Sequence, residues 1–113
     1  MQDLRKGSTA LLVLHLLAEE PMYGFQLTEA LRARTGGVLE FAEGMLYPML
    51  HKLERNGLLA GEWRPSVEGP PRKYYRPTPA GLQELAQRRA DWALFADAVD
   101  TALGMNRRWP RAG

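Results

Sequence analysis

The stretch EGMLYPMLHKLERNGLLAGEWRPSVEGPPRKYYRPT, Glu43 to Thr78, decides the fold of this chain. At about 100° per residue, its first part predicts a helix with two different faces. Three leucines lie on one face and a polar set lies opposite: Leu46, Leu50 and Leu53 against Gly44, Pro48, His51 and Arg55. The helix should begin near Gly44, because proline is tolerated only close to a helix start. One face is expected to pack and the other to contact a ligand.

A hairpin is predicted after this helix. Asn56-Gly57 ends the helix, because both residues accept the left-handed conformation of a helix C-terminus. Two short extended runs, 60–64 and 72–76, are joined by 65–71, whose prolines and glycine favour an exposed loop. A partly basic helix followed by a basic hairpin fits a DNA duplex, with the helix in the major groove and the hairpin along the phosphates. We therefore predict a mainly α fold with a small β-hairpin, a winged helix-turn-helix.

The same stretch resembles a known family. The order G-M-L-Y-P-M-L-H-K-L-E-R-N-G-L-L, then W, then P-R-K-Y-Y-R-P-T-P-A-G-L is similar to that of the PadR family of bacterial transcriptional regulators, and so is P-M-Y-G-F-Q-L at 21–27. The resemblance implies that Tyr47 places its hydroxyl on a DNA phosphate, that Lys73 neutralises one, and that either Tyr74 or Tyr75 assists while the other packs inward. For Tyr75 a core role is the favoured interpretation.

Met45 departs from the family pattern, in which a small hydroxyl residue is common at this place. Methionine cannot donate a hydrogen bond, but it can contact a thymine methyl group or pack. His51 and Arg55 are the candidates for base or phosphate contact. The complete set expected to bind DNA is Gln26, Met45, Tyr47, Pro48, His51, Lys52, Arg55, Arg72, Lys73 and Tyr74.

Two further helices are expected before this stretch. One runs from an N-cap at Ser8 to about Glu19 and is apolar on most sides, so Leu11 and Leu14 are expected to face a partner subunit as well as the core. The other runs from Met22 to about Arg34, and Gly24 within it would let two helices approach closely. Residues 38–41 are predicted to pair as a short strand with the base of the hairpin.

A long last helix is predicted from an N-cap at Thr78, with Pro79 in its first turn, to about Leu103. Side chains at alternating spacings of three and four form a coiled-coil-like seam along this helix, and such a seam is expected to pack against another helix. With the two leucines of the first helix, the expected dimer interface is Leu11, Leu14, Leu82, Leu85, Arg89, Trp92, Val99 and Leu103. The predicted organisation is a DNA-binding domain at 1–78, a dimerisation helix at 79–103 and a flexible tail at 104–113.

An effector site is implied by resemblance to the smaller PadR-like regulators, some of which hold flat hydrophobic compounds between their two subunits. Trp92, Phe95 and Ala96 are the residues that would form it here. The alternative for Trp92 is packing within the dimer contact, since aromatic residues at helical spacing usually belong to a core.

Composition narrows the function classes. The 113 residues suffice for one domain, and a net charge of +2 means that any nucleic acid must be met by a local basic patch. The chain has no cysteine, and neither histidine belongs to a metal or catalytic motif, so we expect no cofactor, no metal and no enzymatic activity. We expect a soluble cytoplasmic homodimer that represses transcription at an inverted-repeat operator. The rival interpretation is a winged-helix module that places its basic hairpin on an acidic protein and binds no DNA.

Overall fold

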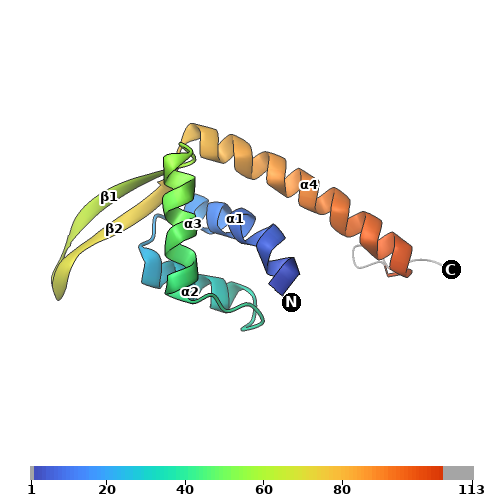
Figure 1. Ribbon diagram of the computed structural model, residues 1–113, viewed down its shortest axis with the longest axis horizontal. Coiled ribbons are helices and arrows are strands. Elements are labelled where there is room, and N and C mark those ends of the chain that lie inside the picture. The colour runs from blue at the N-terminus through green and yellow to red at the C-terminus, as the bar shows by residue number, and fades with distance from the viewer. Residues whose placement is uncertain (1, 106–113) are drawn as a thin grey trace.

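The computed structural model describes residues 2–105, with side chains from Ser8 onward. Its elements follow in the order α1 (Gln2–Glu19), α2 (Gly24–Arg34), α3 (Glu43–Arg55), β1 (Leu59–Ser66), β2 (Gly69–Pro77) and α4 (Pro79–Leu103). Figure 1 shows α1, α2 and α3 gathered in one body, with the hairpin extending from one side and α4 projecting from the other. The predicted class, mainly helical with a small antiparallel hairpin arranged as a winged helix-turn-helix, is confirmed.

Helix α1 begins earlier than predicted, at Gln2 rather than at Ser8. The start was placed at Ser8 because serine is a favoured N-cap residue. However, glutamine, leucine, arginine and lysine are good helix formers, and they extend the helix without needing an apolar face.

The hairpin is longer and its turn shorter than predicted. Strands β1 and β2 pair in antiparallel register from Leu59 with Pro77 to Ser66 with Gly69, with an irregularity between Arg64 and Ser66. The prolines that suggested a seven-residue loop at 65–71 lie within the strands. Proline is compatible with edge strands and with irregular pairing, where its missing N–H costs no ladder hydrogen bond.

A third segment pairs with the base of the hairpin, and it is not the predicted one. Residues 38–41 form no strand. Instead, Met22 pairs with Tyr75, whose N–H donates to the Met22 carbonyl at 2.9 Å while the Met22 N–H donates back at 3.3 Å. Met22 was expected to begin the second helix, but α2 starts at Gly24. The backbone before α2 thus extends the hairpin by one bridge.

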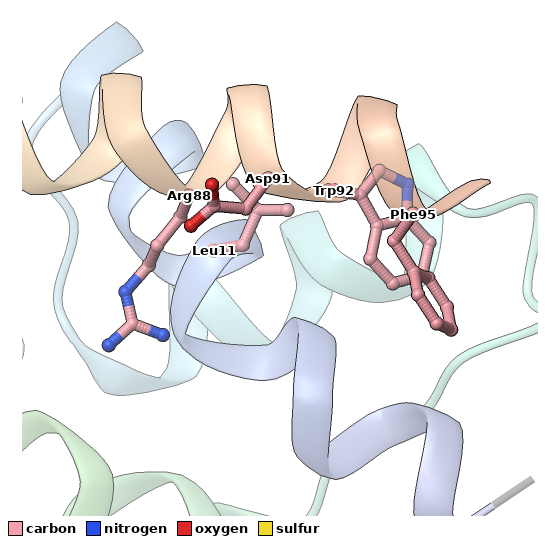
Figure 2. A pocket seen from close by; sticks show the side chains of 5 residues that line it. All are labelled: Leu11, Arg88, Asp91, Trp92 and Phe95. Carbon is pink, nitrogen blue, oxygen red and sulfur yellow. The ribbon is translucent and has the colours of Figure 1, made fainter. Parts of the chain in front are cut away.

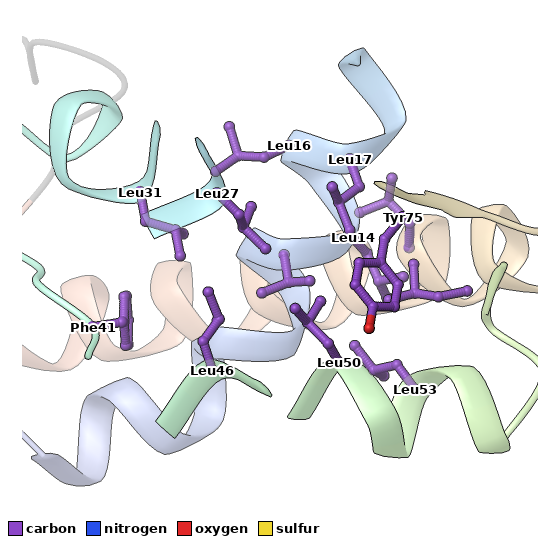
Figure 3. Packing of buried hydrophobic residues seen from close by; sticks show 13 residues of the cluster. Leu14, Leu16, Leu17, Leu27, Leu31, Phe41, Leu46, Leu50, Leu53 and Tyr75 are labelled. Atoms are coloured by element: carbon purple, nitrogen blue, oxygen red, sulfur yellow. The ribbon is translucent and has the colours of Figure 1, made fainter. Parts of the chain in front are cut away.

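The core lies where α1, α2, α3 and the hairpin base meet (Figure 3). Leu46, Leu50 and Leu53 are buried, so the predicted packing face of α3 is confirmed. Tyr75 is also buried, as favoured from the sequence. Leu14 was expected to face a partner subunit, but it has no exposed surface because the helices of its own chain cover it. It must be removed from the predicted dimer interface.

The start of α4 is tied to the connection between α3 and β1. The Thr78 hydroxyl accepts the Gly81 N–H at 3.0 Å, which confirms Thr78 as N-cap, and it donates to the Gly57 carbonyl at 2.6 Å. Gly81 packs so closely on the Leu58 carbonyl that a Cβ atom there would overlap it. Gly104, with φ 74°, ends α4 as predicted. Most of the predicted flexible tail, residues 106–113, lies outside the described residues.

Candidate nucleic-acid interface

The outer face of α3 carries the exposed polar set predicted from the sequence. Pro48, His51, Lys52 and Arg55 are all exposed on this face. Arg55 and Lys52 lie in the last turn, where cations are favoured by the helix dipole. These side chains are free to meet a ligand without disturbing the leucines on the opposite face.

The ring of Tyr47, on α3, packs against Gly24 in the first turn of α2. A Cβ atom on Gly24 would stand 2.6 Å from the Tyr47 hydroxyl oxygen and 2.7 Å from its Cζ atom, so only glycine leaves room for the ring. The Tyr47 side chain remains 38% exposed, and its ring centroid is 6.4 Å from that of His51. The close approach of α2 and α3 expected at Gly24 is confirmed, and it presents the Tyr47 hydroxyl at the surface.

One face of the hairpin looks toward α3. Because strand neighbours alternate between faces, Gly61, Trp63, Lys73 and Tyr75 share this side. The Lys73 ammonium donates to Glu54 Oε1 at 2.8 Å, passing over Gly61, where any side chain would collide with it. This hydrogen bond raises the pKa of Lys73. The lysine expected to neutralise a phosphate is therefore already paired with a carboxylate of α3.

The opposite face of the hairpin carries an alternating stack of cations and aromatic rings. Arg64 Cζ lies 4.3 Å from the Tyr74 ring centroid, and Arg72 Cζ lies 4.5 Å from that of Tyr23. The two tyrosine rings meet edge to face with centroids 5.3 Å apart. Such contacts contribute about 0.5 to 1 kcal/mol each at exposed sites, and here they brace the hairpin against the start of α2.

A groove of about 290 Å³ separates the hairpin from α3 and the first turn of α2. Its walls are aromatic, with cations and a histidine among them: Tyr23, Gly24, Tyr47, His51, Trp63, Pro71, Arg72, Lys73 and Tyr75. Aromatic surfaces beside lysine and arginine suit a sugar-phosphate backbone, whose oxygens accept hydrogen bonds and whose sugars pack on rings.

Trp63 is one of the groove residues that the sequence interpretation missed, together with Tyr23 and Pro71. It is 67% exposed and pairs across the strands with Lys73. An exposed tryptophan is unusual on a small monomeric surface, because it leaves a large apolar area in water. One signal was available in the sequence. Trp63 lies two residues after Gly61 in a predicted strand, so the two residues share a face of the hairpin, which is also the face of Lys73.

Gln26 and Met45 were expected to bind DNA, but they lie away from the groove. Gln26 is half-buried and accepts the Tyr23 N–H through Oε1 at 3.3 Å, so its side chain caps α2. Met45 is 42% exposed, but it lines a different cavity, of about 550 Å³, between α2 and the start of α3. Of the predicted set, Tyr47, His51, Arg72 and Lys73 line the groove, whereas the other members do not: Gln26, Met45, Pro48, Lys52, Arg55 and Tyr74.

Only part of the seam predicted on α4 is exposed. Leu82, Trp92, Val99 and Leu103 are exposed, whereas Leu85 packs into the core of its own chain. Leu11 is half-buried against that core, and Arg89 reaches Nδ1 of His15 on α1 at 3.5 Å. The first half of α4 thus rests on α1, and Figure 1 shows the far half projecting away from the body. The apolar side chains of Trp92, Val99 and Leu103 in this half are exposed.

Two of the three predicted effector residues, Trp92 and Phe95, line a cavity between α4 and α1, and Ala96 does not. The cavity measures about 310 Å³ and is lined by Leu11, Arg88, Asp91, Trp92 and Phe95. In Figure 2, Trp92 and Phe95 lie side by side and Arg88 points away from them. The two ring centroids are 6.0 Å apart. Ala96 follows Phe95 and is half-buried.

The described residues, 2–105, lack two other kinds of feature. No cluster of three or more His, Cys, Asp or Glu side chains there could hold a metal ion. None of the helices described is long and apolar enough to cross a membrane.

Comparison with known proteins agrees with this geometry. Residues 13–87 match the Transcriptional regulator PadR-like family. The transcriptional regulator Rv3488 of Mycobacterium tuberculosis is 39% identical over 89 residues, which are 79% of each chain. Among solved structures, a PadR family transcriptional regulator from Eggerthella lenta is 40% identical with a TM-score of 0.80, covering 93% of this chain and 89% of that one. A transcriptional regulator from Clostridium thermocellum superposes equally well, with a TM-score of 0.80 at 27% identity over 88% of this chain and 96% of its own.

Proposed function

Because this chain belongs to the PadR-like family of transcriptional regulators, we propose that it binds double-stranded DNA sequence-specifically and represses transcription. The observation that carries the proposal is the groove between α3 and the hairpin, where Tyr47, Trp63 and Lys73 meet on one surface. In the proposed complex α3 enters the major groove and the hairpin follows the adjacent phosphates.

Different residues have different tasks in this complex. His51, Lys52 and Arg55 point outward from α3 and read base edges or bind phosphates. The Tyr47 hydroxyl and the Lys73 ammonium bind the backbone, which fixes the register of α3 without specifying sequence. Arg72 is held over the Tyr23 ring and reaches the same backbone.

The chain acts as a homodimer in this proposal, joined through the far half of α4. Support comes from Trp92, Val99 and Leu103, which are 40%, 38% and 66% exposed and follow one another at spacings of seven and four. An isolated helix with such a seam gains stability by pairing with another. Two symmetric subunits then bind two half-sites, so the operator is an inverted repeat.

A small aromatic effector is proposed to release the repressor. The cavity is lined by Trp92, which also belongs to the proposed dimer seam, so a planar compound there could insert between subunits. A ligand that binds one dimer arrangement more tightly shifts the population toward it and away from the arrangement that fits DNA.

Duplex binding is tested by measuring affinity for the chain's own upstream DNA and for a random duplex at several salt concentrations. A DNA-binding regulator shows a steep loss of affinity with salt and a preference for the upstream DNA over the random duplex. Cleavage protection of an inverted repeat would locate the operator. Binding that is weak, salt-independent and without preference would favour the protein-interaction module instead.

Dimerisation is tested by sedimentation of the Val99→Glu/Leu103→Glu variant, which should be a monomer because two charges would face the partner helix. Leu94→Glu is the matched control, since Leu94 is 74% exposed on the other side of α4. A dimeric double variant would contradict the seam. For the effector site, Trp92→Ala should weaken binding of planar aromatic compounds and Trp63→Phe should not.

A further inference from the structure

We propose that Glu54 sets the DNA affinity of this protein by competing with phosphate for the Lys73 ammonium. The inference rests on the proposed function, because it assigns a role within the same groove. Glu54 lies in the last turn of α3, beneath the hairpin face that Lys73 occupies. It is an acidic residue placed where an anionic ligand must approach.

The geometry and partial burial of the Lys73–Glu54 pair indicate a fixed contact and not a chance ion pair on the surface. Lys73 Nζ and Glu54 Oε1 are 2.8 Å apart, and the two side chains are only 25% and 31% exposed. The path between them exists because Gly61, directly across from Tyr75, has no side chain to block it. The Lys73 ammonium also lies 5.3 Å from the centroid of the buried Tyr75 ring. Lysine is thus held in one place, with Glu54 as its partner.

The charge balance decides what the pair does to DNA. An ammonium has three donors, and Glu54 occupies one of them. A phosphate oxygen on another donor would lie roughly 5 Å from the Glu54 carboxylate, given two ordinary hydrogen bonds at a tetrahedral angle. Two like charges at that distance oppose binding even in water. Lys73 and Glu54 together carry no net charge, so contact with this pair releases fewer counterions than contact with a free lysine.

Glu54→Gln separates this role from a structural one. Glutamine keeps the oxygen that accepts from Lys73 and removes only the charge. We expect affinity to rise roughly fivefold for the upstream DNA and for a random duplex alike, since phosphate contacts carry no sequence information. The slope of log affinity against log salt should steepen by about one unit.

Glu84→Gln is the matched control. It removes the same charge from α4, where Glu84 pairs with Arg88 at 2.7 Å, away from the groove. It should leave the salt slope unchanged. The gain from Glu54→Gln should also vanish when Lys73→Ala is added, because the two residues act through one contact. Glu54→Asp moves the carboxylate away from Lys73 and should give a smaller gain in affinity. It provides a second variant if Glu54→Gln lowers the Tm.

The outcomes are distinct. Weaker binding by a Glu54→Gln protein of unchanged Tm would mean that the carboxylate positions Lys73 for DNA, and the proposal would be wrong. An unchanged salt slope, or an equal gain in Glu84→Gln, would overturn it too, the latter because net charge alone would explain the effect. If the unmodified protein binds no duplex in a salt-dependent way, the proposed function itself fails and this inference with it.

Discussion

Replacing Gly24 by alanine should push Tyr47 off the surface where we propose that it meets DNA. The new Cβ atom would stand 2.6 to 2.8 Å from three atoms at the end of the Tyr47 ring. Ordinary contacts of this kind need about 3.5 Å, so the ring must retreat by roughly 1 Å. Because Tyr47 is 38% exposed, it can swing toward solvent instead of forcing the backbone apart.

The effects on stability and on binding can be estimated separately. Overpacking costs about 1 to 3 kcal/mol, and alanine's better helix propensity offsets little of this at the first residue of α2, so the unfolding free energy should fall by about 1 to 3 kcal/mol. A hydrogen bond to a charged phosphate contributes about 1.5 to 3 kcal/mol, so its loss should weaken duplex binding roughly tenfold or more.

A double-mutant cycle with Tyr47→Phe provides the assay. Duplex affinity is measured by fluorescence anisotropy for the unmodified protein, the two single variants and the double variant, with denaturant unfolding alongside. Once Tyr47→Phe has removed the hydroxyl, Gly24→Ala should have little further effect on affinity. Losses that add would refute the reasoning, because Gly24 would then act on DNA binding by another route.

Three further predictions concern the scaffold. Leu50→Ala should destabilise the fold by about 2 to 5 kcal/mol in chemical denaturation, since Leu50 is fully buried, whereas exposed Arg55→Ala should weaken duplex binding at unchanged stability. Gly81→Ala should lower Tm strongly, because its Cβ atom meets a backbone carbonyl that cannot swing aside; an unchanged Tm would contradict that contact. Arg34 lowers the pKa of Glu19, so their pairing stabilises the fold above the ordinary carboxyl range and is lost as pH falls through the lowered pKa. Arg34→Ala should therefore lose less Tm on acidification than the unmodified protein does.

The spacing of apolar residues predicted those parts of the fold for which the sequence pattern is compatible with only one local structure. The leucines of α3 at 46, 50 and 53 can share a face only in a helix, and the Thr78-Pro79 pair marks a helix start by its own chemistry. The outward position of His51 and Arg55 followed from the same helix geometry. These features depend on neighbours in sequence, and the structure confirms them.

The remaining features depend on residues far apart in sequence. Nothing near Lys73 indicates that Glu54 will pair with it, because the contact requires both the hairpin register and the gap at Gly61. The pairing of Met22 with Tyr75 likewise displaced a strand predicted from local β propensity at 38–41. Leu14 was assigned to a partner because α1 is apolar on most sides, yet the core of its own chain buries it completely.

The junction at Leu58 has a mechanical consequence. Its carbonyl accepts the Thr78 N–H at 3.0 Å and packs on Gly81, so together with the packing of Leu85 in the core it fixes the angle at which α4 leaves the body. The 25 residues of α4 span roughly 37 Å. A tilt of about 10° at this junction therefore moves the free end by roughly 6 Å, about one helical turn. In a dimer held at the free ends, the spacing of the two α3 helices would depend on how far the Leu58 junction and the contacts of α4 with α1 allow this angle to change.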